Sequence, residues 1–187
     1  LALVFITAFS CKEAKKETEE ATEEIEETVD QVVETIDPEV ITFSMEPKSD
    51  SNVNGEVVFT QDNGEVIMRA TFTGLDEGEH AIHLHEKADC SSADGKSTGG
   101  HWNPTFEKHG KWGAEDGYHK GDIGNFTADA DGNATVDFST DEWCIGCDDE
   151  KKNILGKAVI VHQGVDDYTS QPSGAAGARI ACTGIIQ

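Results

Sequence analysis

The stretch that decides the fold and the site of this chain is Gly78-Glu79-His80-Ala81-Ile82-His83-Leu84-His85. Side chains alternate between the two faces of a β-strand, so His83 and His85 share one face while Ile82 and Leu84 share the other. Two imidazoles one pleat apart can bind a single metal ion. An alternating pair of histidines is also typical of a surface strand without metal, so this stretch alone leaves both interpretations open.

The other histidines favour the metal interpretation. The chain contains seven histidines, and four of them lie in segments rich in glycine and aspartate that we expect to be loops or strand ends: His101, His109, His119 and His162. Imidazoles gathered from separate segments are what a metal site in a protein requires. A metal centre is therefore the leading hypothesis.

Length and charge set the bounds for this hypothesis. The chain has 187 residues, which is enough for one domain with a real core and an appendage. The net charge of -23 argues against binding to nucleic acid or to an anionic membrane surface through charge. About -9 of this charge lies in residues 12–39 and -14 in the remainder. An anionic substrate therefore needs a local positive group.

The first segment, residues 1–11, is an apolar run that ends in a cysteine and is too short to span a bilayer. We expect the remnant of a bacterial lipoprotein signal, with Cys11 lipidated, although Phe9 occupies a position where lipoproteins usually carry a small residue. An ordinary secretory signal and a segment that is no signal are the alternatives. We therefore expect an exported protein, either periplasmic or anchored to the outer membrane as a lipoprotein. It would contact the membrane only through Cys11, and disulfides could form in that compartment.

Residues 12–39 form an acidic, low-complexity segment. Five aliphatic residues in it follow helical spacing: Ile25, Val29, Val32, Val33 and Ile36. A partner-binding amphipathic helix is one interpretation, and a solvated tether, possibly helical in part, between lipid and domain is the one we favour.

Short apolar runs broken by aspartate, asparagine and glycine begin after Pro38 and are typical of an all-β domain over residues 40–187. Tight turns are expected at Asn63-Gly64 and at residues 131–133. Residues 86–121 show no periodicity and hold three of the seven histidines, so we expect a loop ordered by metal. The eight expected strands cover residues 40–46, 55–60, 65–73, 80–85, 122–128, 134–139, 157–162 and 178–186.

Five motifs in this domain resemble those of one family. They are Gly78-Glu79-His80-Ala81-Ile82-His83-Leu84-His85-Glu86, Gly100-His101-Trp102-Asn103-Pro104, His119-Lys120-Gly121-Asp122-Ile123-Gly124-Asn125, Gly156-Lys157-Ala158-Val159-Ile160-Val161-His162 and Gly177-Ala178-Arg179-Ile180-Ala181-Cys182. Their residues and their order resemble the copper,zinc superoxide dismutase family. The resemblance implies an eight-stranded Greek-key β-sandwich or barrel with long metal-binding loops.

The resemblance also implies two metal sites that share one histidine. Four imidazoles suit tetragonal Cu(II), whereas three imidazoles and a carboxylate suit tetrahedral Zn(II). For His101 the alternative is a surface histidine of a loop, because a bridge requires a doubly deprotonated imidazolate. The implied copper ligands are His83, His85, His101 and His162, and the implied zinc ligands are His101, His109, His119 and Asp122.

Three further residues have implied supporting roles. His80 lies at odd spacing from the two strand ligands, so it faces away from them and is expected to support the site by hydrogen bonding. Asp166 resembles the carboxylate that links two metal-binding histidines, here His83 and His109, the alternative being an ordinary acidic loop residue. Arg179 resembles the residue that guides the anion, the alternative being an arginine in a salt bridge.

The implied reaction is the dismutation of superoxide to dioxygen and hydrogen peroxide through a copper redox cycle that protects the cell envelope. The resemblance assigns catalysis to Arg179 and His101, with His101 delivering a proton to the product. The alternatives are a copper- and zinc-binding or metallochaperone module without turnover and an envelope interaction protein whose working part is the acidic segment. A homodimer is compatible with the resemblance.

The five cysteines divide into three groups. Cys11 belongs to the signal, and the resemblance pairs Cys90 with Cys182 in a disulfide. Cys144 and Cys147 form a Cys-x-x-Cys motif, which occurs as a redox pair, as half of a zinc site or as a local disulfide. We expect the local structural disulfide, because no thioredoxin-like pattern surrounds the motif.

Overall fold

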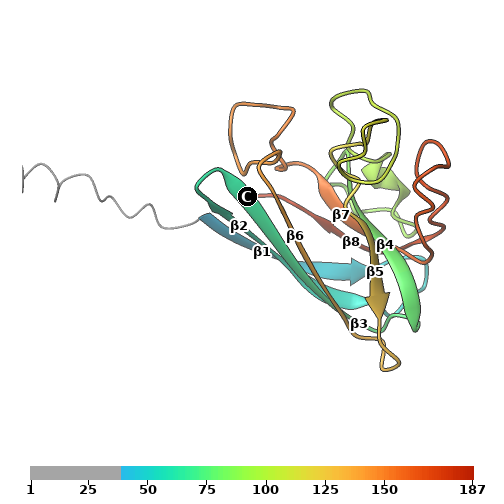
Figure 1. The fold of residues 1–187 in the computed structure, drawn as a ribbon. Helices are drawn as coiled ribbons and strands as arrows, with labels where there is room; N and C mark the ends of the chain where they lie inside the picture. Colours follow the sequence, from blue (N-terminus) through green and yellow to red (C-terminus); the bar gives the residue numbers. More distant parts are fainter. Residues whose placement is uncertain (1–38) are drawn as a thin grey trace, which may run out of the picture. The chain divides into compact units, whose positions relative to one another are not determined.

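The computed structural model describes residues 39–187, which form an all-β unit (Figure 1). The expected signal remnant, Cys11 and the acidic segment up to residue 38 lie outside the described residues. The eight strands are β1 (Glu39–Pro47), β2 (Asn54–Asp62), β3 (Glu65–Thr73), β4 (Gly78–His85), β5 (Gly124–Ala128), β6 (Ala134–Thr140), β7 (Ala158–His162) and β8 (Arg179–Gly184). The predicted fold class is confirmed.

The strands form two antiparallel sheets that join into a nearly closed barrel. Hydrogen bonding links them in the order β5-β4-β7-β8-β1-β2-β3-β6. The sheets meet where the end of β1 pairs with β8, at Glu46 opposite Cys182 and Pro47 opposite Ala181. The outermost strands of this order, β5 and β6, lie in contact but are not paired within the described residues. The order places strands that are distant in sequence, such as β4 and β7, side by side.

The strand that carries the histidine pair is buried on both faces. Strand β3 alternates buried and exposed residues, as expected for one face on the core and one in water. In β4, by contrast, Ile82 and Leu84 belong to the hydrophobic core, and His83 and His85 are only 0% and 1% exposed. The interpretation of this stretch as a surface strand is therefore wrong, because loops cover its histidine face.

Strand β5 begins at Gly124, two residues later than the predicted start at residue 122. The backbone N–H of Asp122 donates to the carbonyl of His119 (3.0 Å) and closes a turn there. A residue held in this turn cannot join the β-ladder, so the Asp122 side chain is free to face the metal-binding loop.

The long loop of residues 86–121 is tied back onto β4 at its middle and at its last residue. The backbone N–H of Trp102 donates to the carbonyl of Leu84 (2.8 Å), and the N–H of Leu84 donates to the carbonyl of Gly121 (2.9 Å). The loop contains the 3-10 helix η1 (Lys96–Thr98), the single helix of the described residues, so no described helix is long enough to cross a membrane. This anchoring brings the loop histidines over β4.

Two disulfides hold the loops. Cys90 and Cys182 join the long loop to β8 and are 92 residues apart in sequence. Cys144 and Cys147 form a local bridge in the segment between β6 and β7, three residues apart. The long-range bridge constrains the unfolded chain far more than the local one does.

Replacing the long-range bridge should therefore cost much more stability than replacing the local one. We expect Cys90→Ala/Cys182→Ala to lower the free energy of unfolding by about 4 kcal/mol and Cys144→Ala/Cys147→Ala by only about 1.5 kcal/mol, from loop-closure entropy. Urea unfolding of the metal-free proteins measures both values. Equal losses of unfolding free energy in the two double variants would contradict the assignment of Cys90–Cys182 as the long-range bridge and Cys144–Cys147 as the local one.

Candidate metal centre

The structure brings seven of the predicted site residues into two buried clusters that share one histidine. In each cluster the candidate ligand atoms all lie within 4.8 Å of one another. The first, here called the four-histidine cluster, contains His83, His85, His101 and His162. The second, here called the histidine–aspartate cluster, contains His101, His109, His119 and Asp122.

The four-histidine cluster presents nitrogen lone pairs to a common point. The Nδ1 atoms of His85 and His162 face the backbone carbonyls of Gly99 (3.0 Å) and Gly177 (3.5 Å), so these nitrogens carry the protons. Their Nε2 atoms are then lone pairs that face each other at 3.4 Å. Two lone pairs cannot hydrogen-bond to one another, whereas a cation between them is attracted to both.

His83 completes this arrangement from the neighbouring position on β4. Its Nε2 faces the carboxylate of Asp166 at 2.9 Å and therefore carries the proton. Its Nδ1 is buried and has no hydrogen-bond partner among the described residues. A buried polar atom without a partner is costly, and a bound metal ion removes that cost.

The histidine–aspartate cluster converges on the carboxylate of Asp122. The Nδ1 atoms of His109 and His119 lie 3.0 Å and 3.3 Å from its oxygens but do not meet hydrogen-bond geometry. Nitrogens that lie close to a carboxylate without pointing at it are typical of ligands aimed at a shared ion. Three imidazoles and one carboxylate match the tetrahedral donor set of zinc.

His101 belongs to both clusters because its two ring nitrogens face in opposite directions. Its Nδ1 lies 2.8 Å from Asp122, while its Nε2 is buried without a partner among the described residues. The residue is only 5% exposed, so the interpretation as a surface loop histidine does not hold. One imidazole can thus contact two cations at once.

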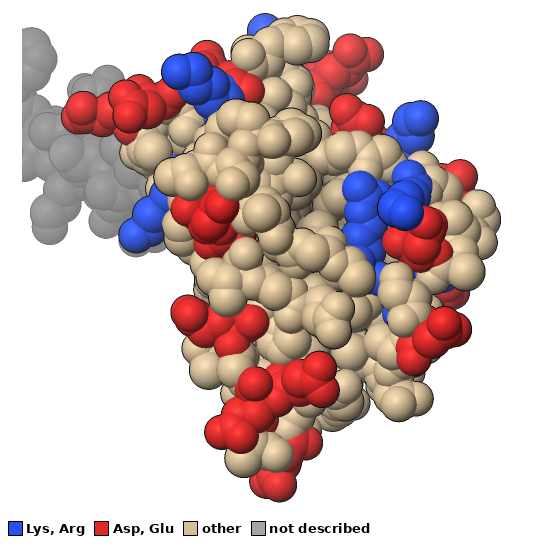
Figure 2. Space-filling view, turned by 90° about the vertical axis from the view of Figure 1, so that its right-hand side faces the viewer, with Lys and Arg blue, Asp and Glu red and all other residues tan. Residues whose placement is uncertain are grey.

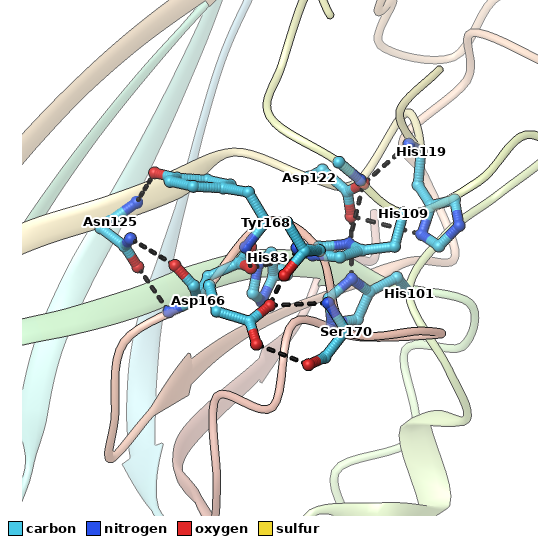
Figure 3. A network of polar contacts seen from close by, with 12 residues as sticks. His83, His101, His109, His119, Asp122, Asn125, Asp166, Tyr168 and Ser170 are labelled. Carbon is cyan, nitrogen blue, oxygen red and sulfur yellow. Dashed lines mark hydrogen bonds and ion pairs between the residues drawn. The ribbon is translucent and has the colours of Figure 1, made fainter. Parts of the chain in front are cut away.

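Asp166 connects the two clusters from behind (Figure 3). One carboxylate oxygen accepts from His83 Nε2 (2.9 Å) and the other from His109 Nε2 (2.8 Å). The side chain is fully buried, and Asn125 and Tyr168 hold its backbone and carboxylate in place. A side chain at Gly174, which has a φ of +66°, would overlap this carboxylate. The position of Asp166 fixes the tautomer of both rings.

Electrostatics keep most of these rings neutral and therefore able to bind metal. Burial lowers the pKa of His101 to about 4 and lowers the pKa values of His85 and His162 well below that of free imidazole. For His109, burial also opposes protonation, but the two nearby carboxylates of Asp122 and Asp166 outweigh it and raise the pKa to about 9. A positive charge, from a proton or a metal ion, is thus stabilised between these two carboxylates.

His80 lies outside both clusters, on the other face of β4. Its Nδ1 lies 3.1 Å from the carbonyl of His162, and its Nε2 lies 2.9 Å from the carbonyl of Asp76. Its ring also lies against Phe126, with the ring centroids 5.9 Å apart. Through these contacts His80 supports the backbone of the strand end that carries His162.

Arg179 lies at the mouth of the site. It lines a pocket of about 720 Å³ together with His85, His101 and His162. Its Nη1 donates to the carbonyl of Gly95 (2.9 Å) and to the hydroxyl of Thr98 (3.0 Å). No carboxylate lies within ion-pair distance of it among residues 39–187, so the structure does not favour the interpretation as a salt-bridge arginine.

Sequence reasoning missed Gln171 and Thr98. The Gln171 side chain accepts from the backbone N–H of His109 (3.0 Å) and donates to its carbonyl (2.9 Å), and Thr98 holds Arg179. Gln171 and His109 are 62 residues apart, so no local pattern could have paired them. These contacts fix the backbone of one cluster histidine and the orientation of the guanidinium.

Comparisons with known proteins agree with this geometry. A family model described as copper/zinc superoxide dismutase matches residues 53–186. Superoxide dismutase [Cu-Zn] 2 of Aquifex aeolicus is 36% identical over 158 residues, which cover 78% of this chain and 90% of that protein. Superoxide dismutase [Cu-Zn] of Caulobacter vibrioides is 35% identical over 142 residues, which cover 74% of this chain and 80% of that protein.

Solved structures show the same fold. A double mutant of a SOD-like protein from Bacillus subtilis has a TM-score of 0.69 and 30% identity, covering 78% of this chain and 97% of that one. A structure titled as the clock protein EA4 has a TM-score of 0.68 and 33% identity, covering 80% and 96%. The chain belongs to the copper/zinc superoxide dismutase family, as the family model and the two relatives show and as the solved structures support.

Proposed function

We propose that this protein dismutates superoxide to dioxygen and hydrogen peroxide. In this proposal the four-histidine cluster holds copper and the histidine–aspartate cluster holds zinc. The observation that carries it is the position of His101. Its Nδ1 lies with Asp122 in one cluster, and its Nε2 lies buried in the other, without a hydrogen-bond partner among residues 39–187. This arrangement serves two ions that share one ring.

The protein's own residues prepare the site for a small anion. Copper supplies one-electron redox chemistry when bound, and zinc supplies a fixed charge. Arg179 presents a guanidinium whose only hydrogen-bond partners among the described residues are neutral, which leaves its charge available to an anion in the pocket. His101 Nε2 lies where a proton can be held beside the same pocket.

The charge distribution explains why a single guanidinium matters. The whole chain carries a net charge of -23, which repels anions at long range. On the face that Figure 2 shows, acidic and basic side chains are scattered around a largely uncharged centre, and one group of basic side chains lies to the right of that centre beside an acidic one. A local positive group can attract superoxide there despite the overall charge.

A metal-binding or metallochaperone module is the alternative, and no observation favours it. Both donor sets are complete and buried, which suits resident ions rather than ions in transfer. The match to a protein titled as a clock protein means that the fold alone does not decide function. Catalysis in this chain therefore depends on the two donor sets and on Arg179.

We further propose that the protein is exported and anchored in the bacterial envelope through a lipid on Cys11. Two disulfides support an oxidising compartment such as the periplasm. Residues 12–39 would then act as the tether and residues 40–187 as the catalytic domain. A homodimer remains a prediction from the resemblance.

Replacing one ligand of the four-histidine cluster should abolish turnover. We expect His162→Ala to lower dismutase activity at least about a hundredfold and to lose copper while retaining zinc, because His162 belongs to one cluster only. Superoxide dismutation assays and elemental analysis of the copper- and zinc-loaded variant measure the activity and the metal content. The matched control, Gln163→Ala, changes the next and exposed residue and should keep full activity. Full activity of His162→Ala, or none in the parent, refutes the proposal.

The two arginines of the chain offer a direct test of anion guidance. We expect Arg179→Gln to lower activity roughly tenfold and to weaken its dependence on ionic strength, because the local positive charge is lost. Arg69→Gln removes the same charge from an exposed pair with Asp137 and should change little. Initial rates across a salt series measure both variants. Equal effects would show that only net charge matters.

The acidic segment should be dispensable for catalysis. A variant that lacks residues 12–37 should keep the activity per copper of the full chain, since every proposed ligand lies beyond residue 82. The same variant distinguishes the dismutase from an envelope interaction protein. Loss of dismutase activity with both metals still bound would be the contrary result.

A further inference from the structure

His119 differs from the other histidines of the two clusters. The two clusters contain six histidines. In four of them one ring nitrogen faces a carbonyl or carboxylate oxygen that holds the ring in place: His83, His85, His109 and His162. In His101 both ring nitrogens face the clusters. The His119 ring lies 3.3 Å from Asp122 and has no second orienting partner among residues 39–187. Its position must therefore depend on the backbone that carries it.

Two consecutive residues, Glu142 and Trp143, contact the side chains and the backbone of the residues on either side of His119. The Tyr118 hydroxyl donates to Glu142 Oε1 (2.7 Å), and Lys120 Nζ forms an ion pair with Glu142 Oε2. The Trp143 indole N–H donates to the carbonyl of Lys120 (2.8 Å). Glu142 thus contacts both chain neighbours of His119, and Trp143 contacts one of them, Lys120.

Aromatic packing makes this contact rigid. Trp143 is 1% exposed, and its ring lies edge-on to Trp112 with the centroids 5.9 Å apart. Trp112 in turn lies against Tyr118 at 5.0 Å and against Phe138 of β6 at 4.8 Å. A hydrogen bond from a buried indole has a defined direction and no competing water, so it fixes the Lys120 carbonyl firmly.

The disulfide Cys144–Cys147 begins at the residue after Trp143. The Cys144 backbone also pairs with the returning segment, donating to the carbonyl of Lys152 (2.8 Å) and accepting from Ile154 (3.0 Å). Asn153 adds a hydrogen bond to the carbonyl of Cys147 (3.0 Å). The segment that carries Glu142 and Trp143 is therefore closed on itself by covalent and hydrogen bonds.

We propose that Glu142 and Trp143 are positioning residues for His119 and that the Cys144–Cys147 disulfide holds them in place. The segment between β6 and β7 then acts as a brace for the zinc side of the site. The proposal rests on the proposed function in one respect, since it takes His119 as a zinc ligand. It adds a role for the Cys-x-x-Cys motif that the dismutation chemistry does not itself use.

The test measures zinc binding rather than turnover. Metal-free full chain is titrated with zinc at neutral pH against a colour-forming chelator, and cobalt(II) in place of zinc gives an absorption spectrum of the same site. We expect Glu142→Ala and Trp143→Phe each to weaken zinc binding about ten- to a hundredfold and to alter the cobalt spectrum. Glu142→Gln keeps an acceptor for Tyr118 and should lose less. Cys144→Ala/Cys147→Ala should weaken zinc binding in the same direction.

Asp137→Asn is the matched control, because it breaks an ion pair with Arg69 at 3.0 Å on the surface of β6 and touches no loop. Its zinc affinity should equal that of the parent. If the Glu142 and Trp143 variants lower only the melting temperature and bind zinc within about twofold of the parent, the role is structural and the proposal fails. A parent that binds zinc without dismutating superoxide refutes the proposed function alone, and a parent that binds no zinc refutes both.

Discussion

The structure depends on the burial of six imidazoles and the Asp122 carboxylate, whose free lone pairs converge on two points. Burying an unpaired lone pair or a carboxylate costs free energy of folding unless a nearby positive charge compensates it. His85 and His162 face each other with unprotonated nitrogens at 3.4 Å, and His83 leaves a buried nitrogen without a partner among the described residues. Two metal ions would satisfy these atoms in the proposed site, so the metals and the loops that cover them are expected to stabilise one another.

The fold supplies this arrangement by combining a rigid strand with anchored loops. Strand β4 contributes His83 and His85 from a fully buried position, and β7 beside it contributes His162. The loop of residues 86–121 hydrogen-bonds to Leu84 at its middle and at its last residue, and the disulfide to Cys182 fastens it to β8. The ligands therefore come from segments far apart in sequence but are held within a few ångström of one another. Outside the ligands, Asp166, Gln171 and the brace between β6 and β7 fix the backbone and the tautomers.

Much of this could be predicted from the sequence, for identifiable reasons. All eight strands were predictable because they are short apolar runs separated by turn residues. The error at Asp122 arose because a turn replaced the first ladder pair. The face of β4 was ambiguous, since periodicity does not reveal whether a loop covers it. The contacts of Gln171 and Glu142 were beyond prediction because they join residues 62 and 24 positions apart that carry no common motif.

In the proposed site two different ions share the ring of His101. X-ray diffraction from crystals of the copper- and zinc-loaded protein, recorded on both sides of the copper and zinc absorption edges, tests it most directly. The account predicts two separate peaks, with copper beside Nε2 of His101 and zinc beside Nδ1 near Asp122. A single ion, two ions in exchanged positions, or ions remote from His101 would contradict it.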